Sequence, residues 1–156
     1  MRRLWNCSDS EMSLSINRSA LVMHSSHKMY ELVSDITSYA DFLPWCSKSD
    51  VLESGDGYVI ARVEVSKGVV RQAFTTRNDL TLDGRMSMVL VDGPFKRLVG
   101  AWDFIHLQDN ACKVVLTLDF ELKKNISKMA FGAVFNQAAN SMVDAFCTRA
   151  NQIYGT

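Results

Sequence analysis

The chain has 156 residues, of which 47% are hydrophobic and 22% are charged. This length and composition are typical of one globular domain, and they exclude collagen, a coiled coil or a disordered chain. The 17 basic residues balance the 17 acidic residues, so the net charge is zero. A general attraction to phosphate backbones is therefore excluded, and any contact with nucleic acid requires a local basic patch. No apolar run reaches the ~18 residues that a membrane-spanning helix needs.

Residues 1–12 are predicted to be a disordered extension, and residues 13–156 are expected to form the domain. Residues 6–11 are polar and therefore lack the apolar segment of a signal peptide. The sequence leaves open whether Met1 or Met12 is the natural start. Alternating apolar and polar residues predict a first strand over 14–22.

Two short helices are predicted after this strand. Ser25 or Ser26 is a suitable N-cap, and Met29, Leu32 and Ile36 follow it at helical spacing. A second helix is expected over residues 39–43, where Pro44 would end it.

About six strands are predicted next, because alternating segments are separated by glycine-containing turns. Their expected ranges are 51–53, 58–66, 69–80, 85–91, 98–107 and 112–122. The turns are short, so the sheet is predicted to be antiparallel. Residues 112–122 are apolar on one side and polar on the other, which is typical of a sheet with one face in water.

The last 27 residues or so are predicted to form one long amphipathic helix, since apolar residues recur every three or four positions from Phe131 to Ile153. Its apolar side needs a partner, and the concave face of a curved sheet is the one available. The predicted fold class is α+β, with a curved antiparallel sheet of six to seven strands around this helix. We expect a cavity between them, which would be the default ligand site.

Aromatic residues and methionines are the candidate lining of this cavity, although each could instead pack the core. The candidates are Phe42, Trp45, Phe74, Met88, Phe95, Trp102, Phe104, Phe120, Phe131, Phe135 and Met142. Phe42, Trp45 and Phe95 are expected near loops, where aromatic side chains often line the mouth of a site. Arg71 and Arg149 lie on apolar elements and are candidate polar anchors, with paired surface charges as the alternative.

The sequence gives little support for a metal site or a catalytic nucleophile. The four cysteines have no C-x-x-C spacing, and the three histidines are not placed to bind one metal. Reduced thiols in a cytoplasmic protein are expected, with Cys46 predicted to be the most exposed of them. Basic residues between Arg71 and Arg97 are interrupted by acidic ones, so a phosphate-binding patch is only weakly indicated.

Three segments resemble the coenzyme Q-binding START-domain family, in the helix-grip group that also contains polyketide cyclases. Residues 39–46 (YADFLPWC) match its Y-x-x-F-L-P-W-C segment, and residues 91–104 match its D-G-P-F-x-x-L…W-x-F segment. Residues 143–154 match its C-terminal helix. The resemblance covers residues 14–155 and implies a START/helix-grip fold with an apolar tunnel.

The resemblance implies three alternative functions. The first is non-enzymatic binding of ubiquinone (coenzyme Q) in support of respiration, with Trp45, Trp102, Arg71 and Arg149 as candidate donors to the quinone carbonyls. The second is a toxin that binds the large ribosomal subunit and blocks subunit association. The third is a polyketide cyclase or dehydrase. No covalent cofactor is expected, and the predicted location is cytoplasmic with transient contact to the inner membrane surface.

Overall fold

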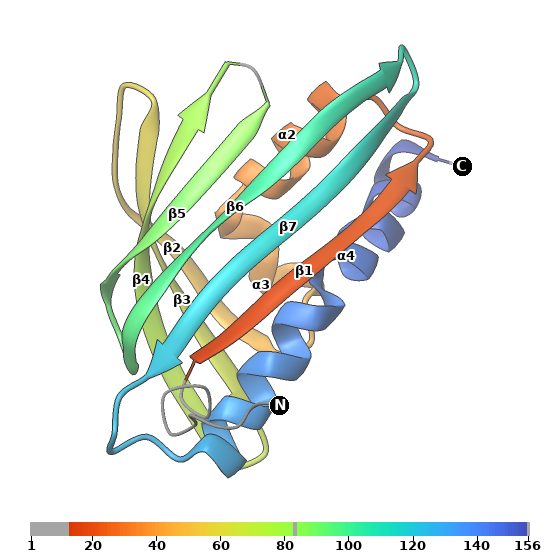
Figure 1. Ribbon diagram of the computed structural model, residues 1–156. Helices are drawn as coiled ribbons and strands as arrows, with labels where there is room; N and C mark the ends of the chain where they lie inside the picture. Colours follow the sequence, from red (N-terminus) through yellow and green to blue (C-terminus); the bar gives the residue numbers. More distant parts are fainter. Residues whose placement is uncertain (1–12, 83, 156) are drawn as a thin grey trace, which may run out of the picture.

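The computed structural model describes residues 13–82 and 84–155, and seven strands in this part of the chain form one antiparallel sheet (Figure 1). The strands are β1 (Ser13–Val22), β2 (Cys46–Gly55), β3 (Tyr58–Lys67), β4 (Val70–Thr81), β5 (Arg85–Asp92), β6 (Phe95–Gln108) and β7 (Ala111–Leu122). Their order across the sheet is β1-β7-β6-β5-β4-β3-β2. The predicted fold class and strand number are thus confirmed. The predicted extension over residues 1–12 lies outside the described residues.

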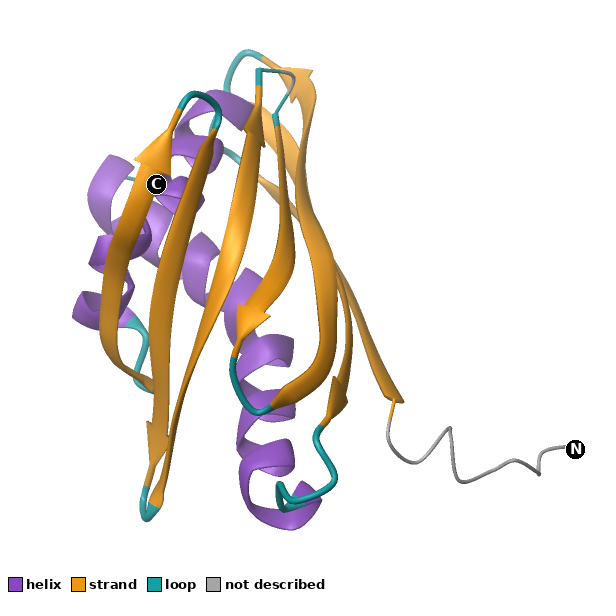
Figure 2. Cartoon of the chain, turned by 90° about the vertical axis from the view of Figure 1, so that its left-hand side faces the viewer, coloured by secondary structure: helices purple, strands orange, loops and turns teal. Residues whose placement is uncertain are grey.

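The helices are α2 (Ser26–Ser34), η1 (Ile36–Ser38), α3 (Tyr39–Phe42), the π-helical turn η2 (Lys128–Gly132) and α4 (Ala133–Tyr154). Ser25 caps α2, because its Oγ accepts a hydrogen bond from the Lys28 N–H at 3.1 Å. The long helix α4 runs along the concave face of the curved sheet (Figures 1 and 2). Among the described residues, no helix is both long and apolar enough to cross a membrane.

Two strands begin earlier than the sequence pattern predicts. β2 starts at Cys46 instead of residue 51. It is an edge strand and mostly exposed, so residues 46–50 need few apolar side chains and show no alternation that would indicate a strand. β6 starts at Phe95 instead of residue 98, with Phe95 paired to Leu122 of β7. A register shift between Phe95 and Arg97 breaks the alternation there and hides the strand from a periodicity argument. Phe95 is therefore a buried strand residue and not a loop residue.

The core consists of two apolar clusters. One packs α2, α3 and the second half of α4 against the sheet, and the other packs η2 and the first half of α4. Trp45, Phe74 and Met88 are only partly buried and pack against both clusters. The space between the clusters is where the sheet and α4 leave a cavity.

Candidate ligand-binding cavity

The inner cavity lies between the concave face of the sheet and α4 and has a volume of about 70 Å³. It is lined by Ile36, Tyr39, Trp45, Ala61, Val63, Phe74, Thr76, Asn78, Met86, Met88, Leu98, Trp102, Leu116, Leu118, Phe135, Ala138, Ala139 and Met142. Almost all of these side chains are apolar, so a bound molecule would be held mainly by contact with hydrocarbon.

Strand alternation and small residues explain why the space exists. Phe74, Thr76 and Asn78 are alternate residues of β4, so their side chains point to the same face. On the opposite wall, α4 presents Ala138 and Ala139, whose short side chains do not fill the gap. Lining residues thus come from both walls, and the two alanines contribute to the space between them.

Three side chains give the cavity its polar character. Asn78 is 2% exposed, its Oδ1 accepts a hydrogen bond from Thr76 Oγ1 at 3.3 Å, and its Nδ2 donates to the Thr76 carbonyl at 3.4 Å. The indole Nε1 of Trp45 is buried and has no hydrogen-bond partner within the described part of the chain. A buried donor without a partner is costly and calls for an explanation. An acceptor on a bound ligand would satisfy it.

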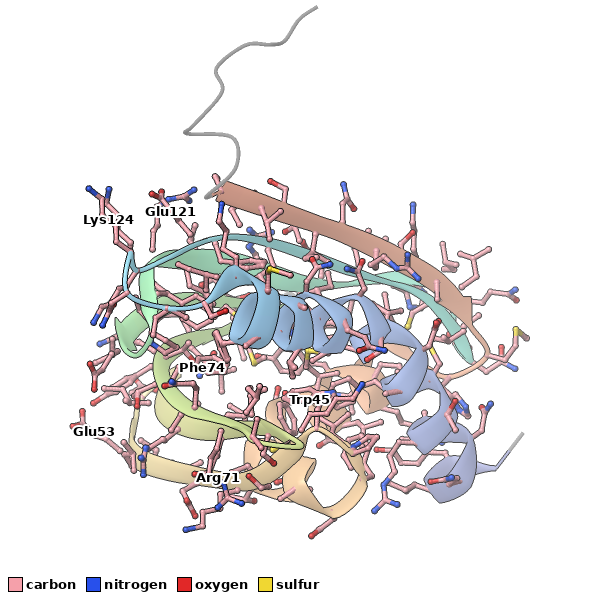
Figure 3. All side chains as sticks on the ribbon, turned by 90° about the horizontal axis from the view of Figure 1, so that it is seen from below. Trp45, Glu53, Arg71, Phe74, Glu121 and Lys124 are labelled. Atoms are coloured by element: carbon pink, nitrogen blue, oxygen red, sulfur yellow. The ribbon has the colours of Figure 1, made fainter. Side chains whose placement is uncertain are left out.

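Trp45 lies between the inner cavity and a hollow at the surface, and it lines both. A second hollow of about 290 Å³, here called the mouth, shares Trp45 and Ala138 with the cavity and is also lined by Ser66, Lys67 and Gln137. Lys67 Nζ donates a hydrogen bond to Gln137 Oε1 at 3.1 Å, which connects the β3–β4 hairpin to α4 beside the mouth. Figure 3 looks at this end of the molecule and shows Trp45 and Phe74 pointing into the space between β4 and α4.

The structure separates the predicted lining residues into three groups. Those in the inner cavity are Trp45, Phe74, Met88, Trp102, Phe135 and Met142. Those buried in the core outside the cavity are Phe95, Phe104, Phe120 and Phe131. Phe42 and Arg149 line a third hollow, of about 360 Å³, on the other side of Trp45, and the Arg149 guanidinium lies 5.0 Å from the centre of the Phe42 ring.

The predicted polar anchors do not lie in the inner cavity. The Arg71 side chain is exposed and lies 3.9 Å from Glu64, and Arg149 is partly covered by stacking on Phe42. Asp103 accepts two hydrogen bonds from Arg85 Nη1, at 2.8 and 2.9 Å, on the outer side of the sheet. Arg71 is therefore a paired surface charge, which was the alternative to a polar anchor, and Asp103 of β6 is paired in the same way.

Sequence reasoning did not single out several lining residues. Ile36 and Tyr39 were expected on the two short helices, Ala138 and Ala139 are small, and Thr76 and Asn78 are polar. A signal for the last two was present, since they follow Phe74 at a period of two on a predicted strand. The Tyr39 hydroxyl donates to the Val33 carbonyl, so this ring is fixed as part of the wall.

The cysteine prediction was wrong for Cys46. This residue is 4% exposed, its Sγ donates to the Lys48 carbonyl at 3.3 Å, and burial raises the pKa of the thiol to about 11. Burial also raises the pKa of Cys112 to about 11. Among the described residues, no group of three potential metal ligands comes together.

We therefore expect Cys46 and Cys112 to resist iodoacetamide at pH 8 in the native protein, because little thiolate forms and the sulfur atoms are covered. Both should be labelled in urea. Peptide mass spectrometry after a timed reaction measures this, and rapid labelling of Cys46 before unfolding would contradict the burial described here.

Comparisons with known proteins agree with this architecture. A family model described as polyketide cyclase / dehydrase and lipid transport matches residues 22–147. The ribosome association toxin RatA of Escherichia coli K12 is 48% identical over 139 residues, covering 89% of this chain and 88% of RatA. The mitochondrial coenzyme Q-binding protein COQ10 homolog B of Xenopus laevis is 27% identical over 143 residues, covering 89% of this chain and 59% of its own length.

The fold is also similar to that of a solved enzyme. The Zhui aromatase/cyclase from Streptomyces sp. R1128 superposes with a TM-score of 0.78 at 20% identity, covering 90% of this chain and 94% of Zhui. Both the sequence match and the sheet-and-helix architecture with its apolar cavity point to one group of proteins. The chain belongs to the polyketide cyclase / dehydrase and lipid transport family and has its START-like fold.

Proposed function

We propose that this chain binds an apolar ligand that carries a hydrogen-bond acceptor, with an isoprenoid quinone such as ubiquinone as the first candidate. The observation that carries the proposal is the apolar cavity with one unpartnered donor, Trp45 Nε1. A quinone carbonyl is an acceptor attached to an apolar body. The similarity to a coenzyme Q-binding protein supports the same ligand class.

The energetics give the polar groups the selective role. An isoprenoid tail gains almost nothing on moving from a bilayer into the cavity, because both surroundings are hydrocarbon. Discrimination between quinones and other lipids must then come from hydrogen bonds to the head group, each with a net contribution of about 1 kcal/mol. Trp45, Trp102 and Asn78 are the cavity residues that carry indole or amide donors, and Trp45 Nε1 is the buried one without a partner among the described residues.

The cavity must expand to hold a quinone ring. Its volume of about 70 Å³ is smaller than the ~150 Å³ of a protein cavity that accepts benzene. Met86, Met88 and Met142 line it, and unbranched methionine side chains adapt easily to a guest. Rotation of Trp45 would join the cavity to the mouth, where the tail could extend.

The lining favours binding over catalysis. The described cavity residues include no carboxylate, histidine, lysine or cysteine, and Tyr39, whose pKa is raised by burial, is the one titratable group. A cyclase or dehydrase needs a group that transfers protons near neutral pH. We therefore propose a non-enzymatic role for this chain.

The direct test is to extract the purified protein with organic solvent and to titrate the extracted protein with a short-chain ubiquinone, following tryptophan fluorescence. We expect a quinone in the extract or saturable binding of the added one. If the extract contains no quinone and the added one does not bind, the proposal is wrong.

Trp45→Phe is expected to weaken binding of the short-chain ubiquinone about fivefold, because an aromatic ring, although a smaller one, is kept while the hydrogen bond of about 1 kcal/mol is lost. The matched ligand is an alkylbenzene of the same chain length, which has no acceptor. Its affinity should change much less, and isothermal titration measures both. Equal losses for the two ligands would show that Trp45 acts only through packing.

Ribosome association is the second candidate, and the 48% identity to RatA of E. coli supports it. A chain with zero net charge would bind ribosomal RNA through a local basic patch, so binding should weaken steeply as salt is raised. Co-sedimentation with the large ribosomal subunit across a salt series tests this. A chain that stays at the top of the gradient at low salt does not have this function.

A further inference from the structure

One end of the molecule is strongly basic, although the whole chain has zero net charge. Three segments lie at this end: the β3–β4 hairpin (66–71), the start of β6 (93–97) and the connection from β7 through η2 (122–132) (Figures 1 and 3). Together they contain seven basic residues and no acidic one. The basic residues are Lys67, Arg71, Lys96, Arg97, Lys123, Lys124 and Lys128.

Three acidic residues, Glu64, Asp92 and Glu121, lie just outside these segments and offset part of this charge. Glu121 lies 3.6 Å from Lys96, and Glu64 lies 3.9 Å from Arg71. Lys67 donates to the neutral Gln137. The surface formed by the three segments, here called the basic end, is therefore positive and suited to an anionic partner.

Two apolar side chains protrude from the basic end. Val69 is 102% exposed at the tip of the β3–β4 hairpin, and Met129 is 92% exposed on η2. β4, which starts at the residue after Val69, contacts η2, so both side chains stand at the same end of the molecule. Exposed aliphatic side chains surrounded by lysines are typical of a segment that inserts into the interfacial region of a lipid bilayer. The phosphate groups of an RNA would provide no apolar surface against which these two side chains could be buried.

We propose that the basic end docks on an anionic lipid bilayer, with Val69 and Met129 inserted among the acyl chains and the lysines on the phosphates. The mouth is formed by Ser66 and Lys67 of the hairpin and by Val134 and Gln137 of α4, so it opens at the same end. If the proposed ligand binding holds, docking would place the mouth against the membrane in which such a ligand dissolves. The docking itself does not depend on that function.

The test uses the full chain and vesicle co-sedimentation. We expect binding to phosphatidylcholine vesicles that contain phosphatidylglycerol and little binding to phosphatidylcholine alone. K123E/K124E should weaken binding by at least about 25-fold, because each lost basic residue near an anionic surface contributes roughly fivefold and the added carboxylates are repelled by it. V69S/M129S should weaken it about tenfold through lost apolar burial.

The opposite end supplies matched controls. Leu82 is 109% exposed in the β4–β5 turn, and Lys113 is exposed near the start of β7. L82S and K113E should bind the anionic vesicles as the unmodified chain does. Equal losses in these controls, or no binding by the unmodified chain, would overturn the proposal.

Two further readouts separate the alternatives. If V69S/M129S binds normally while K123E/K124E does not, the surface recognises polyanions such as RNA, and the bilayer proposal is wrong. The short-chain ubiquinone titration should be unchanged in all these variants. Normal quinone binding without vesicle binding would therefore reject the docking surface and leave the ligand proposal standing.

Discussion

Phe95→Ala is expected to lower the free energy of unfolding by about 3–5 kcal/mol, because it opens a cavity at the centre of an aromatic cluster. Phe95 is 1% exposed. The ring centres of Phe74, Phe120, Phe131 and Phe135 lie between 4.8 and 5.9 Å from its own. Since these rings come from β4, β7, η2 and α4, the substitution loosens the contact between the sheet and the start of the long helix.

Urea denaturation followed by circular dichroism measures this change. The matched control is Phe95→Leu, which keeps most of the volume and should cost less than about 1.5 kcal/mol. Hydrogen exchange should speed up first in η2 and the first turns of α4, which depend on the cluster. A loss below about 1 kcal/mol for Phe95→Ala would mean that the cluster does not hold the helix to the sheet.

The fold could be predicted from local patterns because each element carries its own signal. The alternation in residues 112–122 indicates a strand with one buried face, and glycine at turns such as 55–57 ends strands regardless of distant contacts. The pairing of β1 with β7 has no such signal. Alternation shows which side of a strand is buried, but the identity of its neighbour depends on contacts far apart in the sequence.

The cavity was harder to predict from the sequence. Periodicity indicates on which face of the sheet a side chain lies, but not whether it lines a cavity or packs in the core. Phe120 and Leu118 are alternate residues on the same face of β7 and belong to the same core cluster, yet only Leu118 also lines the cavity. The difference depends on what α4 places opposite each of them. The Phe135 ring lies 4.8 Å from that of Phe120, whereas Leu118 lines the cavity together with the small residues Ala138 and Ala139 of α4.

The segments that carry the family resemblance have identifiable physical roles. In residues 39–46, Tyr39 and Trp45 line the cavity, and Cys46 begins the edge strand β2. In residues 91–104, Gly93 has a φ of 148°, and an added Cβ would lie 2.6 Å from the Cβ of Phe74. Only glycine at position 93 allows the turn before β6 to pack this closely against Phe74. This contact holds Phe74 in its place in the cavity lining.

Ala139→Leu is expected to weaken binding of the short-chain ubiquinone by about 100-fold or more. Ala139 is 2% exposed and lines the cavity from α4, so the added carbon atoms would occupy space that the ligand needs. A quinone ring excluded from the cavity loses contacts worth roughly 0.3 kcal/mol for each heavy atom. The protein itself should remain folded, with a change in stability of at most about 1–3 kcal/mol, because the new side chain enters existing space.

The matched control is Ala133→Leu, the same substitution at an exposed position on the same helix. Alanine and leucine have similar helix propensities, so both variants should keep α4 intact. Thermal melts establish folding, and the ubiquinone titration is then compared among the three proteins. Loss of binding in Ala139→Leu alone locates the ligand between the sheet and α4. If Ala139→Leu binds as tightly as the unmodified chain, the ligand does not use this cavity, and the binding site must lie on another surface.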